Sequence, residues 1–158
     1  MILVFAQCEK HYAPIKITAE NFHNAQNQLT AVMVHDIFSP PLASRVYAYT
    51  NIAAYEILAQ EKGNKYSSLN NILTGFKGIT PIKDSLVNPK LAAVIAYLEV
   101  GKNLIFSVDK MTKYIDSLSI NWKKQNPDIY TSSRRYADQV VEEIKAWYDQ
   151  DNYKQTRT

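Results

Sequence analysis

The side chains best suited to chemistry in this sequence are the adjacent pair His35-Asp36 and the isolated Arg45. A carboxylate that orients an imidazole supports proton transfer, and a planar guanidinium can bind a phosphate or a carboxylate. Adjacent helical residues point about 100° apart, however, so His35 and Asp36 do not face each other. No nucleophile accompanies them. We therefore expect structural roles for both, with Arg45 paired to an acid such as Glu56 or Asp36.

Metal-binding and covalent chemistry find little support elsewhere in the chain. Cys8 is the only cysteine, which excludes a disulfide framework and a cysteine-rich zinc site. The three histidines, His11, His23 and His35, form no local metal motif, and the sequence has neither a glycine-rich phosphate loop nor a Gly-x-Ser-x-Gly turn. From the residues alone we predict no metal site, no catalytic residue and no cofactor in this chain.

Composition narrows the class of protein further. The chain has 158 residues, a net charge of +3 and 46% hydrophobic residues, enough for a buried core. Its basic residues do not cluster, so we predict no nucleic-acid binding. No apolar run approaches the roughly 20 residues of a membrane-spanning helix, so no transmembrane segment is expected. Only four glycines and six prolines are present, which favours long helices over a turn-rich sheet protein.

Apolar spacing predicts an all-α fold, a bundle of about six helices. The second expected helix carries apolar and small residues all round, so we expect it to be central. Ala53 and Ile57 should be buried, and Ala48, Ala53 and Ala54 should allow close approach of neighbouring helices. Residues 17–150 would form the helical domain, and residues 151–158 a polar tail or a truncated connector. The expected helices cover residues 18–38, 39–60, 68–74, 88–105, 108–124 and 132–149. Asn88-Pro89 is expected to cap the fourth and Ser107 the fifth, and Asn126-Pro127 to mark a break before the sixth. Glu99 and Lys102, three residues apart on the fourth helix, can pair with each other.

The first 16 residues suggest a processing segment. The apolar run Met1 to Ala6, followed by Gln7 and Cys8, resembles the end of a secretory signal, with Cys8 in the place of a lipid-bearing cysteine. This interpretation predicts a periplasmic or cell-envelope location. The alternative is a docked N-terminal segment with an inert thiol.

Three stretches resemble a known family. The run HDIFSPPLASRVYAYTNIAAYE, from His35 to Glu56, resembles the N-terminal region of bacterial vanadium-dependent haloperoxidase-related proteins of the type 2 phosphatidic acid phosphatase superfamily. The stretches GKNLIFS, from Gly101, and DNYKQTRT, from Asp151, are similar to the same region. The resemblance covers roughly residues 17–158 and implies the N-terminal part of a larger helical enzyme, a hydrolase or a peroxidase.

The family's chemistry rests on three motifs that hold phosphate or vanadate in a basic pocket. They are a lysine shortly before Arg-Pro, the tetrapeptide Pro-Ser-Gly-His, and a Ser-Arg followed by a histidine and an aspartate. Ser44-Arg45 begins the third, but Asn51 stands where its histidine would be and Tyr55 where its aspartate would be. Neither Arg-Pro nor Pro-Ser-Gly-His occurs in the sequence.

The resemblance therefore implies a structural N-terminal segment that lacks the catalytic motifs and is inactive alone. Its partner would be the missing C-terminal catalytic half, and vanadate or phosphate would bind only in the complete protein. The alternative is a stand-alone helical interaction module that recruits a partner through its aromatic surface. A third alternative, an independent enzyme, would use His35, Asp36 and Arg45.

Overall fold

The computed structural model describes residues 12–61, 63 and 65–156, and all regular structure in this part of the chain is helical. The all-α prediction is confirmed, with five long helices instead of six. The proposals about Cys8 and the apolar run before it lie outside the described residues. The helices are α1 (Ala19–His35), α2 (Pro40–Leu58), α3 (Pro89–Leu104), α4 (Val108–Gln125), α5 (Pro127–Tyr148) and the single turn α6 (Tyr153–Thr156).

Two of the six predicted helices need correction. Residues 68–74 form turns instead of a helix, and Asn71 has a left-handed backbone with φ of 62° that a helix cannot continue through. The last long helix begins at Pro127 instead of residue 132, because the side chain of Asn126 accepts a hydrogen bond from the Ile129 amide at 3.1 Å and caps it. We did not predict α6.

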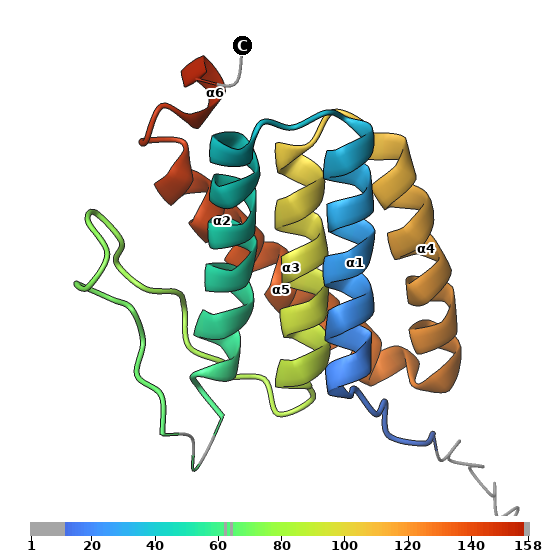
Figure 1. The fold of residues 1–158 in the computed structure, drawn as a ribbon. Helices are drawn as coiled ribbons and strands as arrows, with labels where there is room; N and C mark the ends of the chain where they lie inside the picture. The colour runs from blue at the N-terminus through green and yellow to red at the C-terminus, as the bar shows by residue number, and fades with distance from the viewer. Residues whose placement is uncertain (1–11, 62, 64, 157–158) are drawn as a thin grey trace, which may run out of the picture.

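The first four helices lie side by side, and α5 crosses behind them obliquely (Figure 1). The central helix is α3, which contacts α1, α2, α4 and α5. All its residues from Leu91 to Gly101 are buried. Our prediction that α2 is central was wrong, since Ala48 on its outer face is exposed. Ala53 and Ile57 are fully buried, as predicted, and face α3 from the inner side of α2.

Two features let α3 be buried on every side. A Cβ placed on Gly101 would lie 3.0 Å from Leu29 Cδ1, so glycine allows close packing of α3 against α1. Glu99 is the buried carboxylate of the helix, and it pairs with Lys102 one turn on and with Arg134 of α5 at 2.8 Å. Buried charges need such partners, because an unpaired one is costly to remove from water. The predicted pair of Glu99 and Lys102 is confirmed.

The long connection between α2 and α3 has no helix in its described residues, 59–61, 63 and 65–88, and carboxylates of the neighbouring helices hold it in place. Glu56 of α2 accepts hydrogen bonds from the Ser68 hydroxyl at 2.7 Å and the Leu69 amide at 2.6 Å. Glu143 of α5 accepts from both the amide and the hydroxyl of Thr80, at 2.9 and 2.6 Å. Side chains thus supply the hydrogen bonds that a loop backbone lacks.

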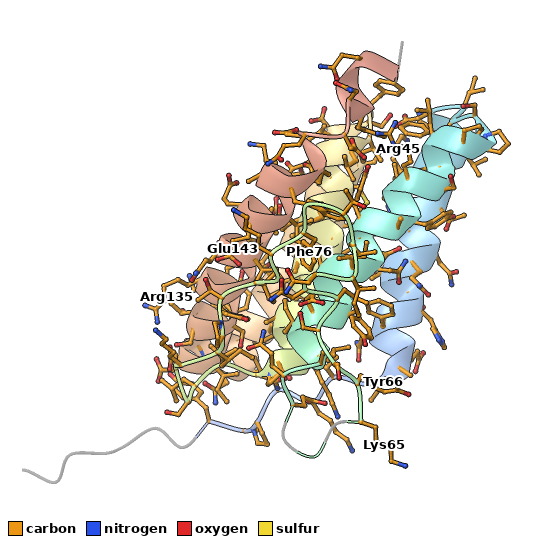
Figure 2. The ribbon with its side chains drawn as sticks, turned by 90° about the vertical axis from the view of Figure 1, so that its left-hand side faces the viewer. Arg45, Lys65, Tyr66, Phe76, Arg135 and Glu143 are labelled. Atoms are coloured by element: carbon orange, nitrogen blue, oxygen red, sulfur yellow. The ribbon has the colours of Figure 1, made fainter. Side chains whose placement is uncertain are left out.

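The same connection is also anchored by an aromatic contact. Phe76 is buried and packs against Trp147 of α5, with ring centroids 5.0 Å apart. Figure 2 shows Phe76 directed between the helices, whereas Lys65 and Tyr66 lie at the outer end of the loop. The indole nitrogen of Trp147 donates to the carbonyl oxygen of Thr74 at 3.0 Å. The loop is therefore a fixed layer over α2 and α5.

The contrast between Ala53 and Ala48 on one helix provides a stability test. Replacing the buried Ala53 by leucine should lower the free energy of unfolding by about 1–3 kcal/mol through overpacking against α3. Ala48→Leu is the matched control and should change it by less than about 0.5 kcal/mol, because its side chain faces solvent. Urea denaturation followed by circular dichroism measures both. Equal effects at the two positions would contradict the packing described here.

Candidate functional site

Asp36 lies at the end of α1 and joins this helix to the turn between α3 and α4. Its carboxylate accepts hydrogen bonds from the amides of Phe106 at 2.8 Å and Ser107 at 2.9 Å. The Ser107 hydroxyl donates to the same carboxylate. Three donors on one ionised acceptor form a strong clasp between segments 70 residues apart in sequence. We call these three residues the Asp36 clasp.

The clasp also sets the acidity of Asp36. Partial burial opposes ionisation, but the hydrogen bonds from Ser107 and Phe106 prevail and hold the pKa of this carboxyl below its ordinary value of 3.8. Ser107 is the N-cap residue of α4, as predicted, yet its hydroxyl bonds to Asp36 instead of capping the helix. Asp36 is therefore a charged structural acceptor at neutral pH.

His35 does not form a catalytic pair with Asp36. It is exposed in the last turn of α1, whereas the Asp36 carboxylate turns to Phe106 and Ser107. The structural role that we expected for Asp36 agrees with this geometry, whereas the role of His35 stays a prediction.

Ile37 follows the clasp in an unusual conformation. Its φ is +55°, a left-handed backbone that is unfavourable for a β-branched residue. The Ile37 amide bonds to the carbonyl of Val34 and the Phe38 amide to that of Met33, which is the Schellman motif that usually carries glycine at this position. Such strain costs about 1–3 kcal/mol. The rest of the turn, including the Asp36 clasp, must hold it.

Arg45 is committed to the C-terminal segment. Its guanidinium forms an ion pair with the Asp151 carboxylate at 2.7 Å and donates to the Asp151 carbonyl at 2.9 Å. It also lies 5.0 Å from the ring centre of Tyr153, a cation–π contact. Our prediction that Arg45 pairs with Glu56 or Asp36 was wrong. The Glu56 carboxylate instead binds the loop, and the Asp36 carboxylate belongs to the Asp36 clasp. Figure 2 shows Arg45 at the end of α2 nearest to this segment.

Tyr153 explains why the last described residues fold back. Its side chain is buried, and its hydroxyl donates to the carbonyl of Leu104 at the end of α3 at 3.0 Å. Its ring stands edge-on to that of Tyr49, with centroids 6.1 Å apart. We missed the roles of Asp151 and Tyr153. The signal available was an aromatic residue within an otherwise polar segment.

An open groove of about 770 Å³ lies at the opposite end of the helices. Its walls are mainly apolar, with Ile17, Phe22 and Leu58 among them, and Lys90 and Glu61 are its charged residues. His35, Asp36 and Arg45 do not line it. The three candidate residues therefore share one end of the bundle, but no large cavity brings them together.

Metal and membrane features can be assessed over residues 12–61, 63 and 65–156. Within these residues no group of three or more histidine, cysteine, aspartate or glutamate side chains could hold a metal ion. None of the helices described has both the length and the apolar character needed to cross a bilayer.

The fold, the Asp36 clasp and the Arg45–Asp151 ion pair thus define a helical domain in which Asp36 and Arg45 have structural roles. The sequence matches no family model, and no curated protein matches it. Among solved structures, the chain is similar to one titled "Crystal structure of the first bacterial vanadium dependant iodoperoxidase", with 44% sequence identity and a TM-score of 0.88. The match covers 94% of this chain but only 36% of the iodoperoxidase chain.

The residues at this end do not fit a vanadate or phosphate ion. An oxyanion site needs several cations or amide donors directed at one point. Here the Arg45 guanidinium is neutralised by Asp151, and the clasp amides already bind the Asp36 carboxylate. A negative carboxylate also stands next to His35. No chemical step is therefore assigned to this chain.

Asp36→Asn should lower the free energy of unfolding at pH 7 by about 1–2 kcal/mol, because charge-assisted hydrogen bonds are lost. The lowered pKa means that the unfolded chain takes up the proton more readily. The stabilisation by the Asp36 charge is therefore complete above about pH 3.8, the ordinary pKa of the group, and is lost as the pH falls below that value. Urea denaturation between pH 7 and pH 3 should show the two proteins converging in acid. Asp116→Asn, at an exposed position of α4, is the control. A difference from wild type that does not depend on pH would contradict the role of the charge.

Arg45→Ala should loosen the C-terminal segment without unfolding the bundle. The ion pair with Asp151 is partly exposed, so we expect a loss of at most about 1 kcal/mol in global stability. Amide hydrogen exchange should become faster over residues 151–156 and stay unchanged in α3. Arg135→Ala removes an exposed ion pair with Asp84 and is the matched control. Unchanged exchange at residues 151–156 would show that Arg45 does not hold this segment.

Proposed function

We propose that this chain is the N-terminal structural segment of a protein of the vanadium haloperoxidase and type 2 phosphatidic acid phosphatase superfamily. The observation that carries the proposal is the match to the bacterial iodoperoxidase. At 44% identity and a TM-score of 0.88 the likeness extends over almost all of this chain, yet it spans about a third of the other. A domain that matches part of an enzyme so closely suits a supporting role in a similar protein.

The chain's own residues support an inactive role. Phosphoryl transfer and peroxidase chemistry on vanadate both need an oxyanion held by several cations, with a histidine beside it, as the resemblance implies. The sequence lacks the three motifs that supply these groups. Arg45, the one arginine of the resembling stretch from His35 to Glu56, is bound to Asp151. The catalytic groups would therefore come from the part of the parent protein that this chain does not contain.

In such a parent the work of this segment is to support the catalytic helices. Its core is already complete, with α3 covered on all sides, so it can serve as a rigid body. The loop residues held by Glu56 and Glu143, the Asp36 clasp and the Arg45–Asp151 ion pair add to this rigidity. Supporting elements of this kind hold catalytic side chains in place without touching the substrate. The cell-envelope location suggested by residues 1–8 stays a prediction.

Activity measurements on two proteins test the proposal. The isolated chain should neither hydrolyse p-nitrophenyl phosphate nor oxidise iodide with hydrogen peroxide and orthovanadate. A chimera in which this chain replaces the matched segment of the iodoperoxidase should fold and oxidise iodide when vanadate is added. The chimera supplies the groups that the chain lacks, and a TM-score of 0.88 means that the backbone of this chain fits the segment it replaces.

His35→Ala is the control for the isolated chain. Turnover by the wild-type chain that this substitution abolishes would make His35 catalytic and overturn the proposal. An insoluble or inactive chimera would equally count against it.

A further inference from the structure

Exposed apolar side chains gather at the end of the bundle that carries the Asp36 clasp. In the part of the chain that the structure describes, nine large hydrophobic residues are exposed, and four of them lie here. The turn between α1 and α2 meets the turn between α3 and α4 at this end (Figure 1). We call this surface the end patch; its residues are Val34 (73% exposed), Ile37 (89%), Phe106 (53%) and Val108 (42%).

The end patch is held rigidly. Asp36 bonds to Phe106 and Ser107, which fixes the two turns against each other. The Phe106 ring also packs on that of Phe38, with centroids 5.1 Å apart. Exposed side chains on such a fixed surface are presented in one arrangement, which lowers the entropy lost when a partner docks.

Ile37 is the residue that most clearly indicates a role for the end patch. Its backbone is left-handed, where glycine is the usual residue, and its side chain is the most exposed of the nine. Neither the stability nor the solubility of the described chain benefits from isoleucine here. A strained residue that remains in spite of this cost points to a role outside the structure described.

We propose that the end patch is the docking surface for the remainder of a larger peroxidase-like protein, through an apolar helical face of that remainder. This inference rests on the proposed function and assigns the contact surface within it. The match covers 36% of the iodoperoxidase chain, so nearly two thirds of that chain lie outside the match and must pack somewhere. The last described element, α6, lies at the same end, where Tyr153 bonds to Leu104 (Figure 1).

The size of the patch favours this occupant over a second copy of the chain. Stable dimers use about 20–30 residues on each side, and the end patch has four large apolar side chains. A covalently joined partner needs far less surface, because the link raises its effective concentration to the millimolar range. The exposed residues Asp109 and Lys110 border the patch with opposite charges, and its four defining side chains are apolar, which suits an apolar face better than an anionic partner.

Ile37→Gly distinguishes docking from folding, because its effect on the melting temperature should differ in sign between the isolated chain and the chimera. In the full 158-residue chain the substitution relieves the left-handed strain, so the melting temperature should stay equal or rise. In the chimera with the iodoperoxidase it removes a docking side chain, so the melting temperature should fall. Val108→Thr is the second variant; it is similar in shape but polar, and it should lower the melting temperature only in the chimera. Ile120→Thr, on exposed α4 surface outside the patch, should shift both proteins alike.

Each other outcome overturns the inference in a recognisable way. If the wild-type chimera is folded and active but Ile37→Gly and Val108→Thr shift both proteins alike, the end patch is not the docking surface and the proposed function stands. If the wild-type chimera fails to fold, the proposed function and this inference fail together. If the isolated chain forms a dimer in light scattering that Ile37→Gly disperses, the occupant is a second copy instead.

Discussion

The burial of α3 on every side is the constraint on which the rest of the structure depends. A helix that is apolar all round must be covered by other elements, and α1, α2, α4 and α5 each cover part of it. Because Gly101 has no side chain, Leu29 can pack close to the backbone of α3. Glu99, a carboxylate buried in this core, forms ion pairs with Lys102 and Arg134. The remaining helices are amphipathic because one face of each meets α3 or its neighbours, and α4 and α5 leave the other face to solvent.

Because the other long helices all take part in covering α3, the long connection between α2 and α3 has to be stabilised by other contacts. The described residues of this connection make only turn-type backbone hydrogen bonds, so Glu56 and Glu143 accept bonds that a helix or sheet would otherwise satisfy. Phe76 supplies the apolar anchor against Trp147. Polar side chains on α2 and α5 that look like ordinary surface residues in the sequence are therefore structural, and the loop becomes part of the rigid body.

Local patterns predicted the helices well, but contacts between distant residues could not be foreseen. The apolar periodicity and the Asn88-Pro89 cap placed α3 almost to the residue. The same signal at Asn126-Pro127 was interpreted as a break, although an Asn-Pro pair starts a helix in both places. Arg45 was expected to meet a nearby acid, but its partner Asp151 is 106 residues away. Only the folded chain brings such segments together, which is also why Ser107 was assigned to helix capping and not to Asp36.

The two residues with the clearest chemical potential, Asp36 and Arg45, do the same kind of work at one end of the bundle. Asp36 fixes the turn between α3 and α4, and Arg45 fixes the segment around Tyr153 that bonds to the end of α3. Both are charged groups whose partners are supplied in full by this chain, so neither retains the unmet electrostatic demand of a catalytic site. Their contacts make this end of the bundle a rigid surface, on which the side chain of Ile37 is exposed in a strained turn. Rigidity together with exposed apolar side chains is the combination that a docking surface requires, whereas a catalytic site would need convergent charge. The residues that first suggested chemistry therefore explain, through their structural roles, why this end of the molecule suits an interface.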